Sequence, residues 1–472
     1  MHREALHPHL RERQQLGRLG AWNLLLQALL VGGIAGGVIG AFRLAYTVIQ
    51  AFILERFQAC DIHEPLAAAA IFGGLLCLGL CGWLLVRHEP LIAGSGIPQV
   101  ELEVMGRVRM RWGRVLWTKF VATLLSLTGG LSVGREGPCI QMGAAVGRGV
   151  GDLFGQEAGT GPRFLVGGSV AGLAAAFGAP AAGMCFAFEE MRTMLTAPMI
   201  LFTGVAAGAA WFVVQMLFGF GRVFPLVRME LLDLIMWWIP PLMGAVLGGL
   251  GALYNALLVG CSVRADRCRF LVPPVRIVCV FLLSGALLYC HPAVITGFGP
   301  RVVDLERLTL PLATLLPLLF LKMLHASVSF ASGAAGGLLM PMLAVGAIAG
   351  GCMADALLDA DCIVAGQEGT ICALGMAGLF SATVRAPLTG AMLVTEMTGS
   401  YANFPAMLAA AYVAVLTANC LESPPVYESL KLRWLEKLQR IYPPPAAKVA
   451  QASEGDGAKG KGEAAVTSRP GS

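Results

Sequence analysis

Charged residues are scarce in this chain. Only 13% of its 472 residues are Asp, Glu, Lys or Arg, whereas soluble proteins carry about 25%. Residues 193–221, 323–354 and 397–421 contain none of the four. Each of these segments exceeds the ~20 residues that an α-helix needs to cross the hydrocarbon core of a bilayer. The scarcity of charge therefore excludes an ordinary soluble protein and predicts an all-α polytopic membrane protein.

Paired cysteines and metal-ligand patterns are absent as well. The chain has 13 cysteines but no Cys-x-x-Cys pair, and most of them, such as Cys139 and Cys372, lie among apolar residues. We interpret them as small apolar side chains that pack between helices. They do not have the pattern of a disulfide framework or a zinc site. We expect no metal, no cofactor and no nucleic-acid partner.

The basic residues gather in three places: before the first apolar run, around residues 107–114, and after the last apolar run. The positive-inside rule places all three in the cytoplasm. We therefore expect a multi-pass protein of the plasma (inner) membrane with both termini cytoplasmic. We also expect a basic N-terminus at 1–20, membrane halves at 21–225 and 226–430, and a largely disordered tail at 431–472, which is rich in Pro, Ala, Gly and Lys.

An internal repeat supports the division into two halves. Two homologous halves, interrupted by many Gly and Pro residues, are typical of transporters with broken, tilted helices and a site between the halves. The sequence does not show whether the halves are inverted, and we expect that they are. The matched landmarks are Lys119 with Lys322, Gly130 with Gly333, Pro138 with Pro341, Gly143 with Gly346, Gly172 with Gly378, Pro180 with Pro387, Gly183 with Gly390 and Glu190 with Glu396.

Three motifs have the composition of anion-binding helix starts: GSGIP (94–98), GREGP (134–138) and GGLLMP (336–341). Glycine lets the backbone approach a ligand, and proline suits the first turn of a helix. The unpaired N–H groups and positive dipole end at a helix N-terminus attract an anion. Three such ends would bind it without a Lys or Arg, which would hold it too tightly for transport. One such motif alone is more typical of a loop or a tight helix crossing, but two of these occupy matched repeat positions.

Glu136 stands between glycines and a proline within an apolar segment. A charge at bilayer depth costs roughly 2.5–3.5 kcal/mol, so such a residue is expected to be functional. Burial disfavours a charged carboxylate, which predicts a group that accepts a proton when an anion is near. The alternative is an ion pair with Arg135, but adjacent side chains on a helix do not face each other.

Two other polar residues in apolar surroundings have structural alternatives. Glu190 lies in an EEMR run, which fits a helix end at the membrane interface with Glu189 or Glu190 paired to Arg192. Tyr427 fits an interfacial aromatic residue. The residues alone do not decide between these structural roles and a functional one.

The motifs GSGIP, GREGP, GLAAAFGAPAAGMCFAFEEMR and GGLLMP, in this order and spacing, resemble the CLC family of chloride channels and chloride/proton antiporters, in particular its prokaryotic antiporter branch. The resemblance extends from about Val86 to Leu430. It implies a CLC-like fold, a homodimer with one pore in each subunit, and transport of chloride in exchange for protons.

The resemblance also implies roles for individual residues. Glu136 matches the gating glutamate, and Glu190 matches the inner proton-transfer glutamate. The family often has Phe where this chain has Leu339, so we expect altered packing there. The residues that match the chloride-binding positions are Ser95, Leu338, Leu339 and Tyr427. The matching motif backbone consists of Gly94, Gly96, Ile97, Pro98, Gly134, Arg135, Gly137, Pro138, Gly337 and Pro341.

Other functions fit less well. A passive chloride channel would share the anion site and differ in proton coupling, which Glu136 and Glu190 favour. A fluoride exporter fits Ser95 and GREGP poorly. An intramembrane aspartyl peptidase could use the GVGD sequence at 149–152, but it needs a second aspartate, and no Tyr-Asp partner lies in an apolar run. A serine–histidine hydrolase lacks a nucleophile turn to accompany His325. We therefore expect no enzyme.

Overall fold

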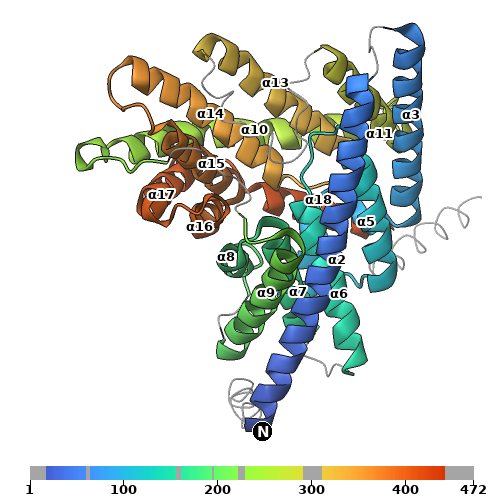
Figure 1. The fold of residues 1–472 in the computed structure, drawn as a ribbon. Coiled ribbons are helices and arrows are strands. Elements are labelled where there is room, and N and C mark those ends of the chain that lie inside the picture. The colour runs from blue at the N-terminus through green and yellow to red at the C-terminus, as the bar shows by residue number, and fades with distance from the viewer. Residues whose placement is uncertain are drawn as a thin grey trace, which may run out of the picture.

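The computed structural model describes residues 18–59, 64–155, 161–193, 196–221, 229–290 and 311–441. These ranges contain 16 α-helices, and seven helices among them are long and apolar enough to cross a membrane. The chain is thus the all-helical, multi-pass protein that its composition predicts (Figure 1). The expected basic segment before residue 18 and the expected tail after residue 441 lie outside the described residues.

The helices follow the apolar runs of the sequence, with short helices inserted at the motifs. The first are α2 (Arg18–Ala59), α3 (Pro65–His88), α4 (Ile97–Val104), α5 (Trp112–Thr128), α6 (Glu136–Leu153), α7 (Gly161–Phe177), α8 (Pro180–Glu189) and α9 (Ala197–Phe218). The others are α10 (Ile239–Arg267), α11 (Pro273–Cys290), α13 (Leu312–Ala331), α14 (Leu339–Asp359), α15 (Glu368–Val384), α16 (Pro387–Thr398), α17 (Phe404–Cys420) and α18 (Val426–Ile441).

Glycine allows two helix pairs to pack with their backbones in contact. A Cβ atom added to Gly143 of α6 would overlap the carbonyl oxygen of Gly168 in α7. A Cβ atom added to Gly346 of α14 would lie 2.6 Å from the carbonyl oxygen of Gly375 in α15. Small residues permit this close approach between helices in a membrane. The α6–α7 and α14–α15 pairs therefore use the same packing device at corresponding places in the repeat.

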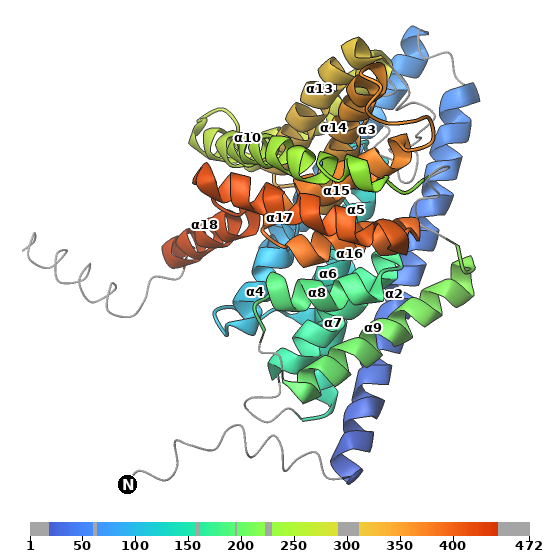
Figure 2. The same ribbon diagram turned by 90° about the vertical axis from the view of Figure 1, so that its left-hand side faces the viewer.

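The short helices α8 and α16 lie side by side and cap each other (Figure 2). The Glu189 carboxylate, at the end of α8, accepts hydrogen bonds from the amides of Leu388 and Thr389 in the first turn of α16, at 3.0 and 2.7 Å. The Glu396 carboxylate, near the end of α16, accepts from the amides of Ala181 and Ala182 in the first turn of α8, at 3.1 and 2.8 Å. A carboxylate stabilises a helix N-terminus. The contact is therefore reciprocal, because each helix ends near a carboxylate that caps the start of the other.

The capping contacts correct the expected alignment of Glu190 with Glu396 as equivalent positions of the internal repeat. Glu189 is the equivalent of Glu396, because it makes the matching contact and has the same sequence separation from it as Pro180 has from Pro387. The expected alignment of Gly172 with Gly378 in the repeat is wrong by one residue as well. A Cβ atom on Gly172 would meet α6, whereas one on Gly378 would meet Leu247 of α10. Runs of Ala and Gly fit either register, and only the tertiary contacts distinguish them.

The end of the second half extends further than expected. Residues 431–441, the first part of the expected tail, belong to helix α18, and the rest of that tail lies outside the described residues. Helix α18 packs on α4 and α10, and Leu430 and Lys431 are buried in this contact. The charged residues of this stretch obscure the apolar face in the sequence. At the other end, α2 begins at Arg18, inside the segment expected to precede the membrane.

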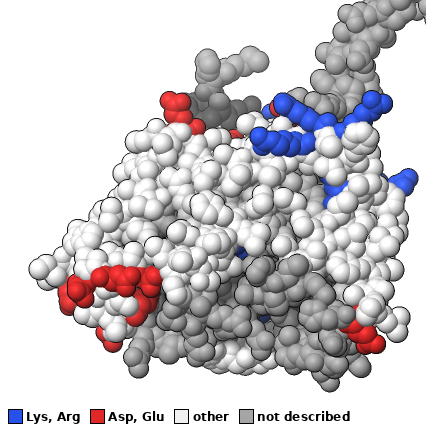
Figure 3. Space-filling view, turned by 90° about the horizontal axis from the view of Figure 1, so that it is seen from above, with Lys and Arg blue, Asp and Glu red and all other residues white. Residues whose placement is uncertain are grey.

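The surface fits a lipid environment over much of its area. The face seen from above is mostly uncharged, and the Lys, Arg, Asp and Glu side chains visible on it lie mainly towards its edges (Figure 3). Large apolar side chains such as Leu44 of α2, Leu84 of α3 and Phe212 of α9 are exposed.

Candidate functional site

The loops before α4, α6 and α14 are hydrogen-bonded to one another. Gly94 donates its amide to the carbonyl of Ala334 at 3.1 Å and accepts from the amide of Gly336 at 3.0 Å. Gly134 and Gly337 exchange two hydrogen bonds, at 2.7 and 2.6 Å. The last two residues are equivalent positions of the repeat. The convergence of the three motifs that the sequence predicts is therefore confirmed, and it lies between the two halves.

Three helix N-termini meet at this point. Helices α4, α6 and α14 begin at Ile97, Glu136 and Leu339, and each has its motif proline in the first turn, as expected. A Cβ atom on Gly137 would lie 2.9 Å from the carbonyl oxygen of Ser95 and 3.2 Å from the Cα atom of Gly337. The first-turn amides of a helix have no partner within it. Together these ends form a region of positive potential that favours an anion.

The Glu136 carboxylate lies inside this region. Glu136 is the first residue of α6 and is completely buried. Its carboxylate is close to the backbone amides of Arg135, Glu136 itself and Met340, the last of which belongs to the first turn of α14. Neither carboxylate oxygen makes a hydrogen bond of good geometry within the described part of the chain. A carboxylate therefore stands between two helix N-termini, where a free anion would be stabilised.

Arg135 is the charged neighbour of this carboxylate. Its Nε atom lies 3.6 Å from the Glu136 Oε1 atom, so the expectation that these two side chains do not pair is wrong. That expectation applies within a helix, and Arg135 precedes the first residue of α6. The contact is long and without a hydrogen bond, and the Arg135 Nε atom also has no hydrogen-bond partner. The pair therefore leaves the hydrogen-bonding capacity of Glu136 unused.

Ser95 and Tyr427 are both buried near the motif loops. The Ser95 Oγ atom accepts a hydrogen bond from the Ile97 amide at 3.2 Å, which leaves its hydroxyl hydrogen able to donate to a ligand. Tyr427 is the second residue of α18, and its buried hydroxyl has no hydrogen-bond partner within the described chain. Buried hydroxyls are nearly always paired, so an unpaired one indicates a place for a ligand or water. Leu338 and Leu339, at the start of α14, are also buried.

Lys119 is a site residue that we did not predict from the sequence. Its fully buried ammonium donates hydrogen bonds to the carbonyls of Ile92 and Gly94, at 2.8 and 2.6 Å. It thereby fixes the loop that leads into the GSGIP motif. The available signal was a lysine in an apolar helix at a matched repeat position, which we used only as a landmark.

Glu190 directly follows the last residue of helix α8, and its side chain is half-buried. It lies within electrostatic range of Glu101, Lys431 and Arg192. Arg192 pairs with Glu428 of α18 at 3.5 Å, so the alternative that Arg192 forms an ion pair with Glu189 or Glu190 is wrong. Glu189 caps α16 instead.

Lys431 joins two carboxylates beside Glu190. Its Nζ atom lies 3.1 Å from Glu101 and 2.9 Å from Glu428. Burial alone would lower the pKa of Lys431, but the carboxylates of Glu101 and Glu428 outweigh it and raise that pKa. The ammonium therefore stays charged around neutral pH and provides a fixed positive charge near Glu190.

Tyr427 is near both glutamates that the sequence singles out. It is within electrostatic range of both Glu136 and Glu190, and of Glu101 as well. A buried hydroxyl without a hydrogen-bond partner in the described chain is thus within electrostatic range of a carboxylate at the anion region and of the half-buried carboxylate of Glu190. The hydroxyl can bind an anion while the two carboxylates take up and release a proton, so the two ions can use neighbouring but different groups.

Two other arrangements bear on the enzymatic and metal-binding alternatives. His325 of α13 lies 3.0 Å from the Oγ atom of Ser284 in α11, a serine that the sequence did not connect with it. Both residues are buried between helices, and Ser284 lies inside a helix instead of an exposed turn. In the described ranges, no group of three or more His, Cys, Asp or Glu side chains is arranged to hold a metal ion.

Comparisons with known proteins identify similar chains. The sequence model of the family described as voltage gated chloride channel matches residues 73–419. The H(+)/Cl(-) exchange transporter ClcA of Vibrio parahaemolyticus is 35% identical over 431 residues, which cover 88% of this chain and 90% of that protein. ClcA of Vibrio cholerae is 34% identical over 444 residues, covering 90% and 92%. The crystal structure of a slow cyanobacterial Cl-/H+ antiporter superposes with a TM-score of 0.79 at 29% identity, covering 88% of this chain and 98% of that one.

Proposed function

The chain belongs to the family of voltage gated chloride channels, and we propose that it transports chloride across a membrane in exchange for protons. The family consists of transporters and not of enzymes, so the peptidase and hydrolase alternatives are excluded. Exchange is favoured because the two ClcA proteins and the cyanobacterial antiporter to which this chain is similar are chloride/proton exchangers. The single observation that carries the proposal is the position of Glu136.

Glu136 serves as the gate in this proposal. Its carboxylate occupies the region where the N-termini of α6 and α14 meet, and it makes no hydrogen bond of good geometry there. A protonated side chain is no longer attracted to positive helix ends, so it leaves and chloride takes its place. Chloride is then held by the Ser95 hydroxyl, the backbone amides of Leu338 and Leu339 at the start of α14, and the Tyr427 hydroxyl.

Glu190 serves as the inner proton-transfer group. The proton passes between Glu190 and Glu136 past Tyr427, which is within electrostatic range of both. The fixed charge of Lys431 stabilises the ionised form of its neighbouring carboxylates and so favours release of the proton from Glu190. Chloride and the proton both pass through the region around Glu136, and their paths separate between that region and α18.

We further propose an arrangement in the cell. The basic residues at both ends place the termini in the cytoplasm of a plasma (inner) membrane, so α18 faces the cytoplasm. The membrane region consists of two inverted halves, at 21–225 and 226–430, which the reciprocal contacts of α8 and α16 support. The functional unit is a homodimer, as the family resemblance implies.

The test uses the purified protein in liposomes that hold a chloride gradient. A pH electrode records protons outside while chloride leaves. Proton entry into the vesicles against a proton gradient, as chloride moves out, is the result expected of an exchanger. Chloride efflux without proton movement would instead establish a passive channel and overturn the coupled mechanism.

A further inference from the structure

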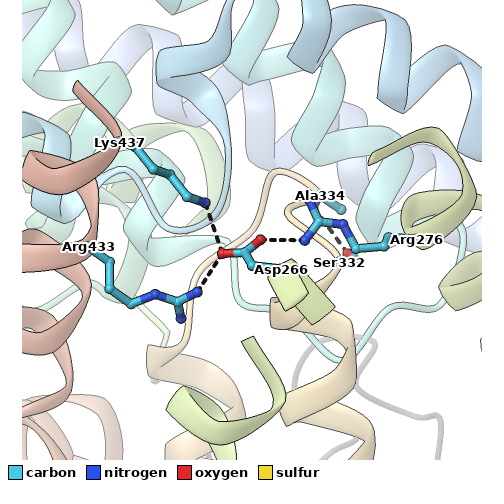
Figure 4. A network of polar contacts seen from close by, with 6 residues as sticks. All are labelled: Asp266, Arg276, Ser332, Ala334, Arg433 and Lys437. Atoms are coloured by element: carbon cyan, nitrogen blue, oxygen red, sulfur yellow. Dashed lines mark hydrogen bonds and ion pairs between the residues drawn. The ribbon is translucent and has the colours of Figure 1, made fainter. Parts of the chain in front are cut away.

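An ion cluster lies where α10, α11 and α18 meet (Figure 4). The Asp266 Oδ1 atom lies 2.6 Å from Nη1 of Arg276. The Asp266 Oδ2 atom lies 2.6 Å from Nη2 of Arg433 and 3.4 Å from Nζ of Lys437. One carboxylate therefore holds three cations that come from two other helices.

The four charged residues of this cluster line a cavity that reaches the anion site. The same cavity is lined by Gly94, Ser95 and Pro98 of the first motif, and by Gly333 of the loop before α14. We call it the α18 cavity. Ser95 is otherwise buried, so this cavity provides a route between the protein surface and the GSGIP motif.

The charges of the α18 cavity do not balance. Its lining contains three cations and a single carboxylate, and no other charged residue. The Lys437 side chain is 51% exposed at the outer part of the cluster, whereas those of Arg276 and Arg433 are 15% and 20% exposed. The Arg276 Nε atom is buried without a hydrogen-bond partner in the described chain. A concave surface with excess positive charge raises the local concentration of anions and the rate at which they enter.

We propose that Arg276, Arg433 and Lys437 form a chloride-collecting site at the mouth of the α18 cavity, and that Asp266 keeps this site weak. The excess charge attracts chloride towards Ser95. Because Asp266 occupies one face of each cation, no cation is free to surround the chloride ion and retain it. Asp266 is thus a positioning residue that sets how tightly chloride is held on its way to the anion motif. This inference rests on the proposed function and concerns entry from the α18 face.

A structural role for Asp266 is the competing explanation, since its ion pairs also join α18 to α10 and α11. Loss of a merely structural contact would lower the transport rate or the amount of folded protein without changing the chloride concentration at half-maximal rate. The collecting site predicts changes in that concentration, and in opposite directions for the cations and for Asp266.

The experiment measures isotopic chloride exchange in liposomes as a function of chloride concentration, at constant low ionic strength. The variants are K437Q, R433Q and D266N. Arg87→Gln is the control, since Arg87 is an exposed residue of α3 that does not line the cavity. The series is repeated at about 1 M ionic strength, where the Debye length is only ~3 Å.

At low ionic strength, K437Q and R433Q should each raise the half-saturating chloride concentration by about two- to fivefold, because each removes one attracting charge. D266N should lower the half-saturating concentration and also slow the maximal rate, because chloride is then retained. The differences should disappear at high ionic strength, and R87Q should match the unmodified protein. An unchanged half-saturating concentration in all variants, or a D266N variant that changes only the rate, would overturn the inference. Failure of the unmodified protein to carry chloride would instead contradict the proposed function.

Discussion

The starts of helices α6 and α14 are equivalent positions of the repeat with opposite side-chain chemistry. The turn before each helix contains one of the two glycines, Gly134 and Gly337, that hydrogen-bond to each other. Each helix has a proline in its first turn. The first residue is Glu136 in α6 and Leu339 in α14, and both are buried. The backbone is therefore shared, and the side chain at one position distinguishes the two ends.

This difference shows how a symmetric backbone can support a directional process. Two positive helix ends facing one another would hold an anion equally from either side. A carboxylate on one of them supplies an internal anion that competes with the transported one. The apolar side chain on the other leaves its backbone amides available. Substitutions at the two ends, and at the reciprocal caps on α8 and α16, can test whether this asymmetry governs coupling.

The largest effect is expected from Glu136→Gln. Glutamine has nearly the same shape but cannot take up or release a proton, so proton transport should fall to background while chloride flux remains. The measurement is simultaneous recording of chloride efflux and pH in liposomes. Proton pumping that persists in this variant would remove Glu136 from the coupling mechanism and leave the two helix ends functionally alike.

Glu190→Gln should have a nearly equal effect on protons and spare chloride flux, because Glu190 lies away from the anion region but within range of Tyr427. Glu189→Gln is the matched control. The neighbouring Glu189 carboxylate is fully engaged in capping α16, so its variant should keep the coupling. Loss of coupling in Glu189→Gln, with coupling retained in Glu190→Gln, would move proton entry to Glu189.

A moderate effect is expected on stability when the reciprocal caps are removed. Glu189→Gln and Glu396→Gln each weaken hydrogen bonds to the first turn of the facing helix, which should cost about 1–2 kcal/mol. Thermal unfolding of the purified protein should therefore show similar drops for the two variants. Glu436→Gln, on the exposed side of α18, serves as the control and should show none. Very different drops for the two cap variants would contradict the equivalence of α8 and α16.

The smallest effect is expected from Leu339→Met. The volume is nearly conserved, so the loss of stability should stay under about 1.5 kcal/mol. The amide of residue 339 is unchanged, and it is the amide that is proposed to contact chloride. Coupling should therefore be the same as in the unmodified protein when protons and chloride are recorded together. A marked change in coupling would show that the side chain at the start of α14 takes part.

Much of the fold and of the site could be predicted from the sequence, and the misses have a common cause. The GREGP and GGLLMP motifs predicted two helix starts that meet, because their glycines and prolines act locally and at matched positions. The register of Glu189 and Glu190 was missed because both neighbours fit a helix end equally well, and only the amides of α16 distinguish them. Lys119 was missed because its partners, two carbonyls in a distant loop, leave no trace in the sequence.

The sequence by itself determined that this chain spans a membrane, that it contains a repeat, and that an acidic residue is buried among glycines. These follow from composition and local spacing, because the bilayer and the helix impose their constraints on consecutive residues. The folded structure was needed to show that Glu136 lies between two helix ends, that α8 and α16 cap each other, and that Asp266 gathers three cations in the cavity that Ser95 also lines. Each of those contacts joins segments far apart in the chain, and its energy depends on distances and burial that exist only after folding.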